Sequence, residues 1–162
     1  MPGPPESYHT IFQRIARSLV AGLAATAVLW VLKLSRDSVP QLETSRFLDR
    51  VAAATAKATG LPDPLMNGWI WHWVVGTLLW GTLFGIMLPI LPGNRYWLKG
   101  CAFGVIAGLL TMLMVMPLAA AGYFGMELTY LDPVVSLVYH MIYGATLGVA
   151  YAFLAGVHGK TP

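Results

Sequence analysis

The sequence predicts an all-α polytopic membrane protein, with four transmembrane helices arranged as two duplicated helical hairpins and an amphipathic surface helix in the first connection. Composition is the first reason, since 57% of the chain is hydrophobic and only 10% is charged, against about 45–50% and about 25% in soluble domains. Length is the second, since residues 12–34, 69–91, 97–120 and 133–155 are apolar stretches that reach the roughly 20 residues needed to cross a bilayer. An internal repeat is the third.

The repeat consists of a Leu, Asp and Pro motif followed by a histidine. It occurs as Leu61, Asp63, Pro64 and His72, and again as Leu131, Asp132, Pro133 and His140. Each histidine is followed four residues later by a glycine, and an apolar stretch that opens with a cation precedes each copy. The simplest interpretation is a duplicated pair of helices, in which Gly22 of the first stretch corresponds to Gly104 of the third.

The four apolar stretches are separated by residues that end or begin helices. The first is too long for the apolar part of a signal peptide, about 7–15 residues, so we expect it to be retained. Pro92 and Gly93 form a tight connection between the second and third stretches. Asp132 and Pro133 are suited to the start of the fourth. Because little of the chain lies outside these stretches, residues 1–162 are expected to form a single membrane domain.

The longest connection, residues 44–59, predicts an amphipathic helix. Its apolar residues recur at helical spacing, and Gly60 and Pro62 end the pattern. Such a helix lies on the membrane surface or packs on the bundle. Its role is either to cover the bundle or to dock a partner.

Small residues recur along the predicted helices at spacings that bring backbones together. The positions expected to pack against other helices are Gly76, Gly81, Gly85, Gly100, Gly104, Gly108, Gly144 and Gly148. Helices in lipid have little hydrophobic drive to associate, so close approach at small residues holds them together. The principal interpretation is packing within the bundle, and the alternative is contact with another subunit.

Several function classes are disfavoured by the sequence. Asp, Glu, Lys and Arg are missing from the middle of every predicted span, whereas pumps and coupled transporters place such residues there. No nucleophile triad, HExxH motif or phosphate-binding loop is present. The protein is therefore expected not to be an enzyme. The net charge of +3 comes from cations that flank membrane segments, so nucleic acid is not an expected partner.

His72 and His140 are the polar pair that stands out in the predicted helices. The simplest role is hydrogen bonding between helices. Two imidazoles can also ligate a haem b iron or a metal ion, and the glycine four residues after each histidine would leave room for a macrocycle. A contact with a quinone-like group or a lipid headgroup is a further option. Whether a metal binds is left open.

The chain resembles a family of uncharacterised bacterial four-helix integral membrane proteins, a domain of unknown function. The resemblance rests on W-x-W-H-x-x-x-G-T-x-x-W-G at 69–81, L-P-G at 91–93, L-K-G-x-x-F-G at 98–104, a Met-rich run at 112–122 and H-x-x-Y-G-x-x-L-G at 140–148. It covers the second to fourth stretches well and the first loosely. It implies a small polytopic membrane protein without an assigned activity, and it supplies no catalytic residues.

These observations predict a non-enzymatic integral membrane protein that is an accessory or scaffold subunit of a larger assembly, without a cofactor. Expected partners are the lipid bilayer and other membrane subunits or further copies of the chain. The alternative is a bis-histidine haem b electron carrier. A facilitator of lipid or small apolar solutes would need a pocket that a sequence does not display. Arg95 and Lys99 in a short connection place both termini on the cytoplasmic side of the bacterial inner membrane, although Arg50 and Lys57 oppose this.

Overall fold

The computed structural model describes residues 11–37, 45–60, 64–128 and 130–157, and this part of the chain is helical without any strand. The elements in order are α1 (Ile11–Asp37), α2 (Ser45–Thr59), α3 (Pro64–Val74), the π-helical segment η2 (Val75–Trp80), α4 (Gly81–Met87), α5 (Tyr96–Leu110), the π-helical segment η3 (Thr111–Val115), α6 (Met116–Leu118), a 3-10 turn η4 (Tyr123–Gly125) and α7 (Asp132–Ala155).

Within this part of the chain, four helices are long and apolar enough to cross a membrane. They are Ile11–Lys33, Gly68–Met87, Tyr96–Leu118 and Asp132–Ala155, which confirms the predicted fold class. The second span is made of α3, the π-helical segment η2 and α4 in succession. The third span is made of α5, the π-helical segment η3 and α6. The predicted helix at 44–59 is α2, which begins one residue later than expected.

The second span, predicted at 69–91, begins one residue from the start of the candidate span Gly68–Met87 but ends four residues too late. The helix already begins at Pro64, since proline is favoured in the first helical turn where its missing N–H costs nothing. It ends at Met87 because Pro89 has no N–H to continue the helical hydrogen bonds, although Leu88 between them still has a helical backbone conformation. The third span ends at Leu118 rather than 120.

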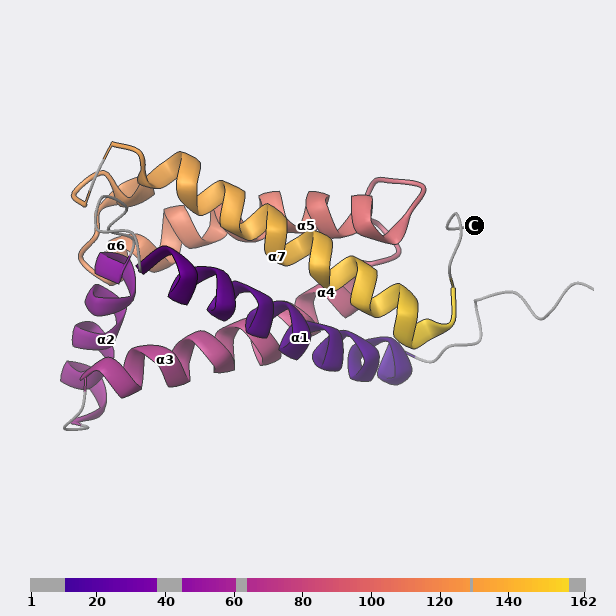
Figure 1. Ribbon diagram of the computed structural model, residues 1–162, viewed down its shortest axis with the longest axis horizontal. Coiled ribbons are helices and arrows are strands. Elements are labelled where there is room, and N and C mark those ends of the chain that lie inside the picture. Colours follow the sequence, from indigo (N-terminus) through magenta and orange to yellow (C-terminus); the bar gives the residue numbers. More distant parts are fainter. Residues whose placement is uncertain (1–10, 38–44, 61–63, 129, 158–162) are drawn as a thin grey trace, which may run out of the picture.

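The helices pack as two antiparallel pairs. In Figure 1, α1 lies against the α3–η2–α4 rod and α5 lies against α7, and α1 also contacts α7. The short helix α2 crosses one end of the bundle, where α1 ends and where α3 and α7 begin. The C-terminus lies at the opposite end. We call these the α2 end and the terminal end of the bundle.

Glycines set the spacing of the α5–α7 pair. A Cβ atom on Gly100 would overlap the carbonyl group of Gly144, and a Cβ on Gly144 would overlap that of Gly100. Cβ atoms on Gly104 and Gly148 would likewise overlap the carbonyls of His140 and Tyr96. No side chain can therefore stand between these two helices without moving them apart.

The α1–α4 pair is built in the same way. A Cβ on Gly81 would lie 3.0 Å from the carbonyl oxygen of Ser18 and one on Gly85 3.0 Å from its hydroxyl, while one on Gly76 would overlap the side chain of Thr26. The eight glycines expected to pack against helices thus all contact other helices of the same chain.

The two pairs share a contact pattern. Gly81 lies against Ser18 and Leu19 as Gly148 lies against Tyr96 and Trp97. His72 and His140 are 68 positions apart, but Gly81 and Gly148 are 67 apart. The first copy therefore holds one extra residue between its histidine and this glycine, where η2 lies. A π-helix accommodates such an inserted residue without ending the helix.

One detail of the expected repeat register is wrong. The sequence pattern paired Gly22 with Gly104. In the structure, a Cβ atom on Gly22 would lie 3.3 Å from the carbonyl oxygen of Gly76. Gly100 packs in the same way against the carbonyl of Gly144. Gly22 thus corresponds in its contacts to Gly100, one helical turn earlier than expected. Superposition of the two pairs in parallel orientation remains the test of the duplication.

Aromatic side chains join the two pairs at the centre of the bundle. Phe84 is 0% exposed and Phe103 is 1% exposed, and their ring centroids are 5.4 Å apart in an edge-to-face arrangement. Tyr151 contacts Phe84 at 5.9 Å and Trp80 contacts Phe103 at 6.2 Å. Such pairs add stability beyond the area that they bury.

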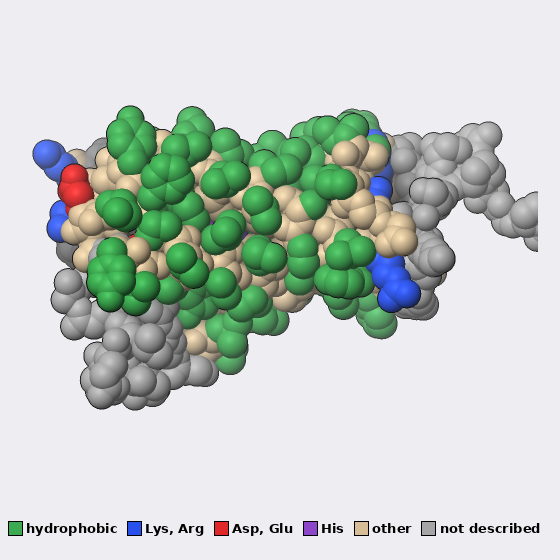
Figure 2. Space-filling view, turned by 90° about the horizontal axis from the view of Figure 1, so that it is seen from above, with side chains coloured by type: hydrophobic (Ala, Val, Ile, Leu, Met, Phe, Trp, Pro, Cys, Tyr) green, Lys and Arg blue, Asp and Glu red, His purple; other side chains and the backbone are tan. Residues whose placement is uncertain are grey.

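The outer surface of the bundle is apolar along most of its length. Figure 2 shows hydrophobic side chains over the middle, Lys and Arg at both ends, and Asp or Glu at one end. The exposed apolar residues come from every long helix and include Leu23, Leu79, Met114, Val149 and Phe153. A continuous surface of this kind is unusual in soluble monomers and typical of a lipid-facing one.

We predict that Gly104→Ala destabilises the protein and that Gly108→Ala, one turn away on the same helix, does not. A Cβ at 104 meets the rigid His140 carbonyl, whereas at 108 the nearest atom is the His140 Cβ at 3.2 Å. Overpacking lowers stability by about 1–3 kcal/mol, whereas the higher helix propensity of alanine relative to glycine raises it by about 1 kcal/mol. Thermal unfolding in detergent measures both, and equal midpoints would contradict the close contact.

Candidate functional site

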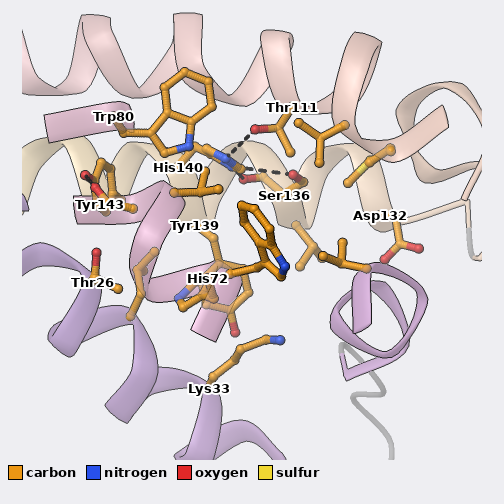
Figure 3. Close-up of a pocket in the computed structure, with 18 residues that line it drawn as sticks. Thr26, Lys33, His72, Trp80, Thr111, Asp132, Ser136, Tyr139, His140 and Tyr143 are labelled. Atoms are coloured by element: carbon orange, nitrogen blue, oxygen red, sulfur yellow. Dashed lines mark hydrogen bonds between the residues drawn. The ribbon is translucent and has the colours of Figure 1, made fainter. Parts of the chain in front are cut away.

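A cavity of about 180 Å³ lies between the helices near the α2 end of the bundle. Both histidines singled out in the sequence line it, His72 from α3 and His140 from α7. The remaining wall comes from α1, η2, η3 and α6, and Val51 of α2 closes one side. The structure therefore brings together two side chains that are far apart in the sequence (Figure 3).

His140 has a hydrogen-bond partner on each ring nitrogen. Its Nδ1 lies 2.8 Å from the backbone carbonyl oxygen of Ser136, and because a carbonyl only accepts, Nδ1 carries the proton. In the neutral ring Nε2 is then an acceptor, and the hydroxyl of Thr111 donates to it at 3.0 Å. The expectation that a histidine bonds to a neighbouring helix is met here, with Thr111 of η3 as the partner.

His72 differs from His140. Its Nε2 atom is buried and has no hydrogen-bond partner within the part of the chain that the structure describes. The ring makes an edge contact with Trp69 at 6.0 Å, and the ammonium group of Lys33 lies 5.5 Å from the centroid of the same Trp69 ring. A buried polar atom without a partner costs about 1–3 kcal/mol, and such atoms often mark a function.

Other polar groups of the wall are paired within the protein. The Tyr143 hydroxyl donates a short hydrogen bond to the carbonyl of Gly76, and the Thr26 hydroxyl donates to the carbonyl of Gly22 at 2.8 Å. Lys33 and the buried carboxyl group of Asp132 line the cavity nearer the α2 end. The wall thus holds one cation and one acid.

Sequence reasoning identified the histidines, with Tyr143 as an expected neighbour, but not Thr111, Lys33 or Asp132 as parts of a site. Tyr143 follows His140 by three positions, so helical spacing places both on one face of α7. That spacing was a usable signal. Thr111 gave none, because its role depends on how α5 and η3 pack against α7.

Both π-helical segments of the described chain border the cavity. Val75, Gly76 and Trp80 of η2 and Thr111 and Val115 of η3 line it. π-helical turns are rare and occur frequently at functional sites. The occurrence of both beside one cavity makes this region the candidate functional site.

The arrangement suits hydrogen bonding better than metal ligation. No group of three or more His, Cys, Asp or Glu side chains that could hold a metal ion occurs among the residues that the structure describes. A metal at His140 would have to displace Thr111 or Ser136 from the ring. The cavity, at about 180 Å³, is also smaller than the roughly 300–1,000 Å³ of typical ligand sites, which disfavours a group as large as haem.

The chain was compared with known proteins. The model of a family described as a family of unknown function, DUF6789, matches residues 12–161, so the chain belongs to this family. No curated protein and no solved structure matches it.

We predict that Thr111→Val lowers stability, because it removes the donor to His140 Nε2 and leaves that buried atom unsatisfied at a cost of about 1–3 kcal/mol. Thr111→Ser, which keeps the hydroxyl, should restore most of the loss. The matched control is Thr146→Val on α7, whose hydroxyl donates at 2.8 Å to Ile142 of its own helix. Thermal unfolding of the three variants in one detergent is the measurement, and parent-like unfolding of Thr111→Val would rule out this hydrogen bond.

Proposed function

We propose that this member of a family of unknown function is a non-enzymatic integral membrane protein that binds a small, mostly apolar ligand in the cavity between its helices. The observation that carries the proposal is the buried Nε2 atom of His72, which lines the cavity and lacks a partner in the described chain. A ligand that hydrogen-bonds to it would remove a cost that the protein otherwise bears.

The composition of the wall supports a ligand site. Apolar side chains dominate it, and the polar groups are few. Small-molecule sites share this composition, in which apolar surface supplies affinity and a few polar groups orient the ligand. The apolar part of the wall includes Leu29, Trp71, Val75, Trp80, Val115, Met116 and Val135. A facilitator of small apolar solutes, one class left open by the sequence, needs such a cavity.

The depth of the cavity fits a ligand that enters from the membrane. At 1.5 Å per residue, His72 lies about 6 Å along its helix from Gly68, and His140 about 12 Å from Asp132. Gly68 and Asp132 begin two candidate spans at the α2 end. The histidines therefore lie within the outer part of the apolar layer, below the boundary with water.

We place the protein in the bacterial inner membrane with both termini on the cytoplasmic side. Arg95 precedes α5 and Lys99 lies in its first turn, both at the terminal end, which the positive-inside rule assigns to the cytoplasm. On the face shown in Figure 2, acidic side chains lie at one end, although acids contribute little to the rule. In this orientation the cavity faces the outer half of the bilayer.

The alternative proposal is an accessory or scaffold role, and the packing of the glycines weakens one argument for it. The glycine faces that could have docked another subunit are used within the chain. The proteins that co-purify in mild detergent test the role directly. The haem alternative is tested by the visible absorption of the purified protein, where a Soret band would favour it despite the small cavity.

We predict that the cavity binds 1,2,4,5-tetramethylbenzene and that Val135→Phe abolishes this binding by filling the space. Val135 lines the cavity, while its neighbour Val134 is 62% exposed on the outer surface, so Val134→Phe is the matched control. The measurement is equilibrium partition into lipid nanodiscs that contain the protein, corrected for empty nanodiscs of the same lipid. No excess in the parent, or equal excess in Val135→Phe, would refute the ligand site.

A further inference from the structure

We infer that the ligand is a flat six-membered ring that carries a carbonyl oxygen, as in a quinone, and that this oxygen accepts a hydrogen bond from Nε2 of His72. The inference rests on the proposed function, because it names the ligand class of the same cavity.

The size and shape of the cavity favour one ring. Its volume is about 180 Å³, and a cavity of about 150 Å³ in another protein holds benzene. One substituted ring therefore fills the space, and any long substituent must lie outside it, against the lipid. The flat side chains of Trp71, Trp80, Tyr139 and Tyr143 line the wall, and aromatic rings stack well on flat ligands.

The hydrogen-bond inventory points to His72. His140 uses both ring nitrogens, Tyr143 donates to Gly76, and Thr26 donates to Gly22. Thr77 also has a buried hydroxyl oxygen without a partner, but it does not line the cavity. Among the buried side-chain atoms without a partner in the described chain, His72 Nε2 is thus the one that belongs to a cavity-lining residue. In the tautomer with the proton on Nε2, it donates to a ligand oxygen within about 3 Å.

The charges of the wall favour a neutral oxygen over a carboxylate or phosphate. Lys33 and Asp132 both line the cavity, so a bound anion would meet the Asp132 carboxylate as well as the Lys33 ammonium. A carbonyl oxygen carries no net charge to repel. It can accept a hydrogen bond from an N–H donor, which suits an Nε2 proton on His72.

The test compares two flat probes with four methyl groups in the same ring positions, tetramethyl-1,4-benzoquinone and 1,2,4,5-tetramethylbenzene. The quinone has carbonyl groups at the two ring positions where the hydrocarbon has C–H groups. The quinone has a methyl group on every open ring carbon, which disfavours addition of the free thiol of Cys101. Partition into nanodiscs with the protein, corrected for empty nanodiscs, gives the affinity of each probe. We expect the quinone to bind about three- to tenfold more tightly, which is what one hydrogen bond contributes.

The variants assign the difference to one atom. His72→Phe keeps a ring but removes Nε2, so it should bind the quinone no better than the hydrocarbon. His72→Gln carries an amide N–H at a similar reach and should keep part of the preference. Binding of the hydrocarbon to both variants shows that the cavity is intact, and Val135→Phe should bind neither probe.

The outcomes separate the inference from the proposed function. Equal binding of the two probes to the parent would overturn the inference and leave the cavity as an apolar ligand site. A preference that survives in His72→Phe would overturn the assignment to His72. Binding of neither probe to the parent would overturn the proposed function together with the inference.

Discussion

The close approach of helix backbones at glycine is the constraint on which the rest of this structure depends. In the α5–α7 pair, a Cβ atom on Gly100 would overlap the carbonyl group of Gly144, and a Cβ atom on Gly144 would overlap that of Gly100. Because lipid supplies little hydrophobic drive for helix association, dispersion between closely packed backbones must hold the pair. The α1–α4 pair uses Gly81 and Gly85 against Ser18 in the same way. Two rigid pairs result, and the aromatic cluster around Phe84 joins them.

The same glycines account for the position of the cavity. Gly144 and Gly148 hold α7 against α5 toward the terminal end, and on the α2 side of them Ser136 and His140 line the cavity. On the other rod, residues such as His72 and Val75 lie on the α2 side of Gly81. Two π-helical segments and larger side chains such as Trp71 and Tyr139 line the space there.

The two histidines occupy matching places in the repeated sequence motif but differ in their bonding. Thr111 of η3 completes His140. The first half of the chain offers His72 an aromatic neighbour instead, since Trp69 contacts its ring and Trp30 contacts Trp69. A hydroxyl donor on one side and indole rings on the other leave one buried nitrogen unsatisfied. Because of this difference between the halves, the cavity is asymmetric and has one open hydrogen-bonding position, at His72 Nε2.

Sequence alone determined the helical class, the four spans to within a few residues at most ends, the α2 helix and the pairing of His72 with His140 as the polar residues of interest. Apolar length and periodicity carry this information, because crossing lipid demands it of every span. Tertiary structure decided the rest. Whether glycine faces meet within the chain, which histidine nitrogen finds a partner, and where π-helical turns open a cavity all depend on side chains and carbonyls from other helices. The hydropathy pattern of one helix does not specify which side chains of other helices will contact it.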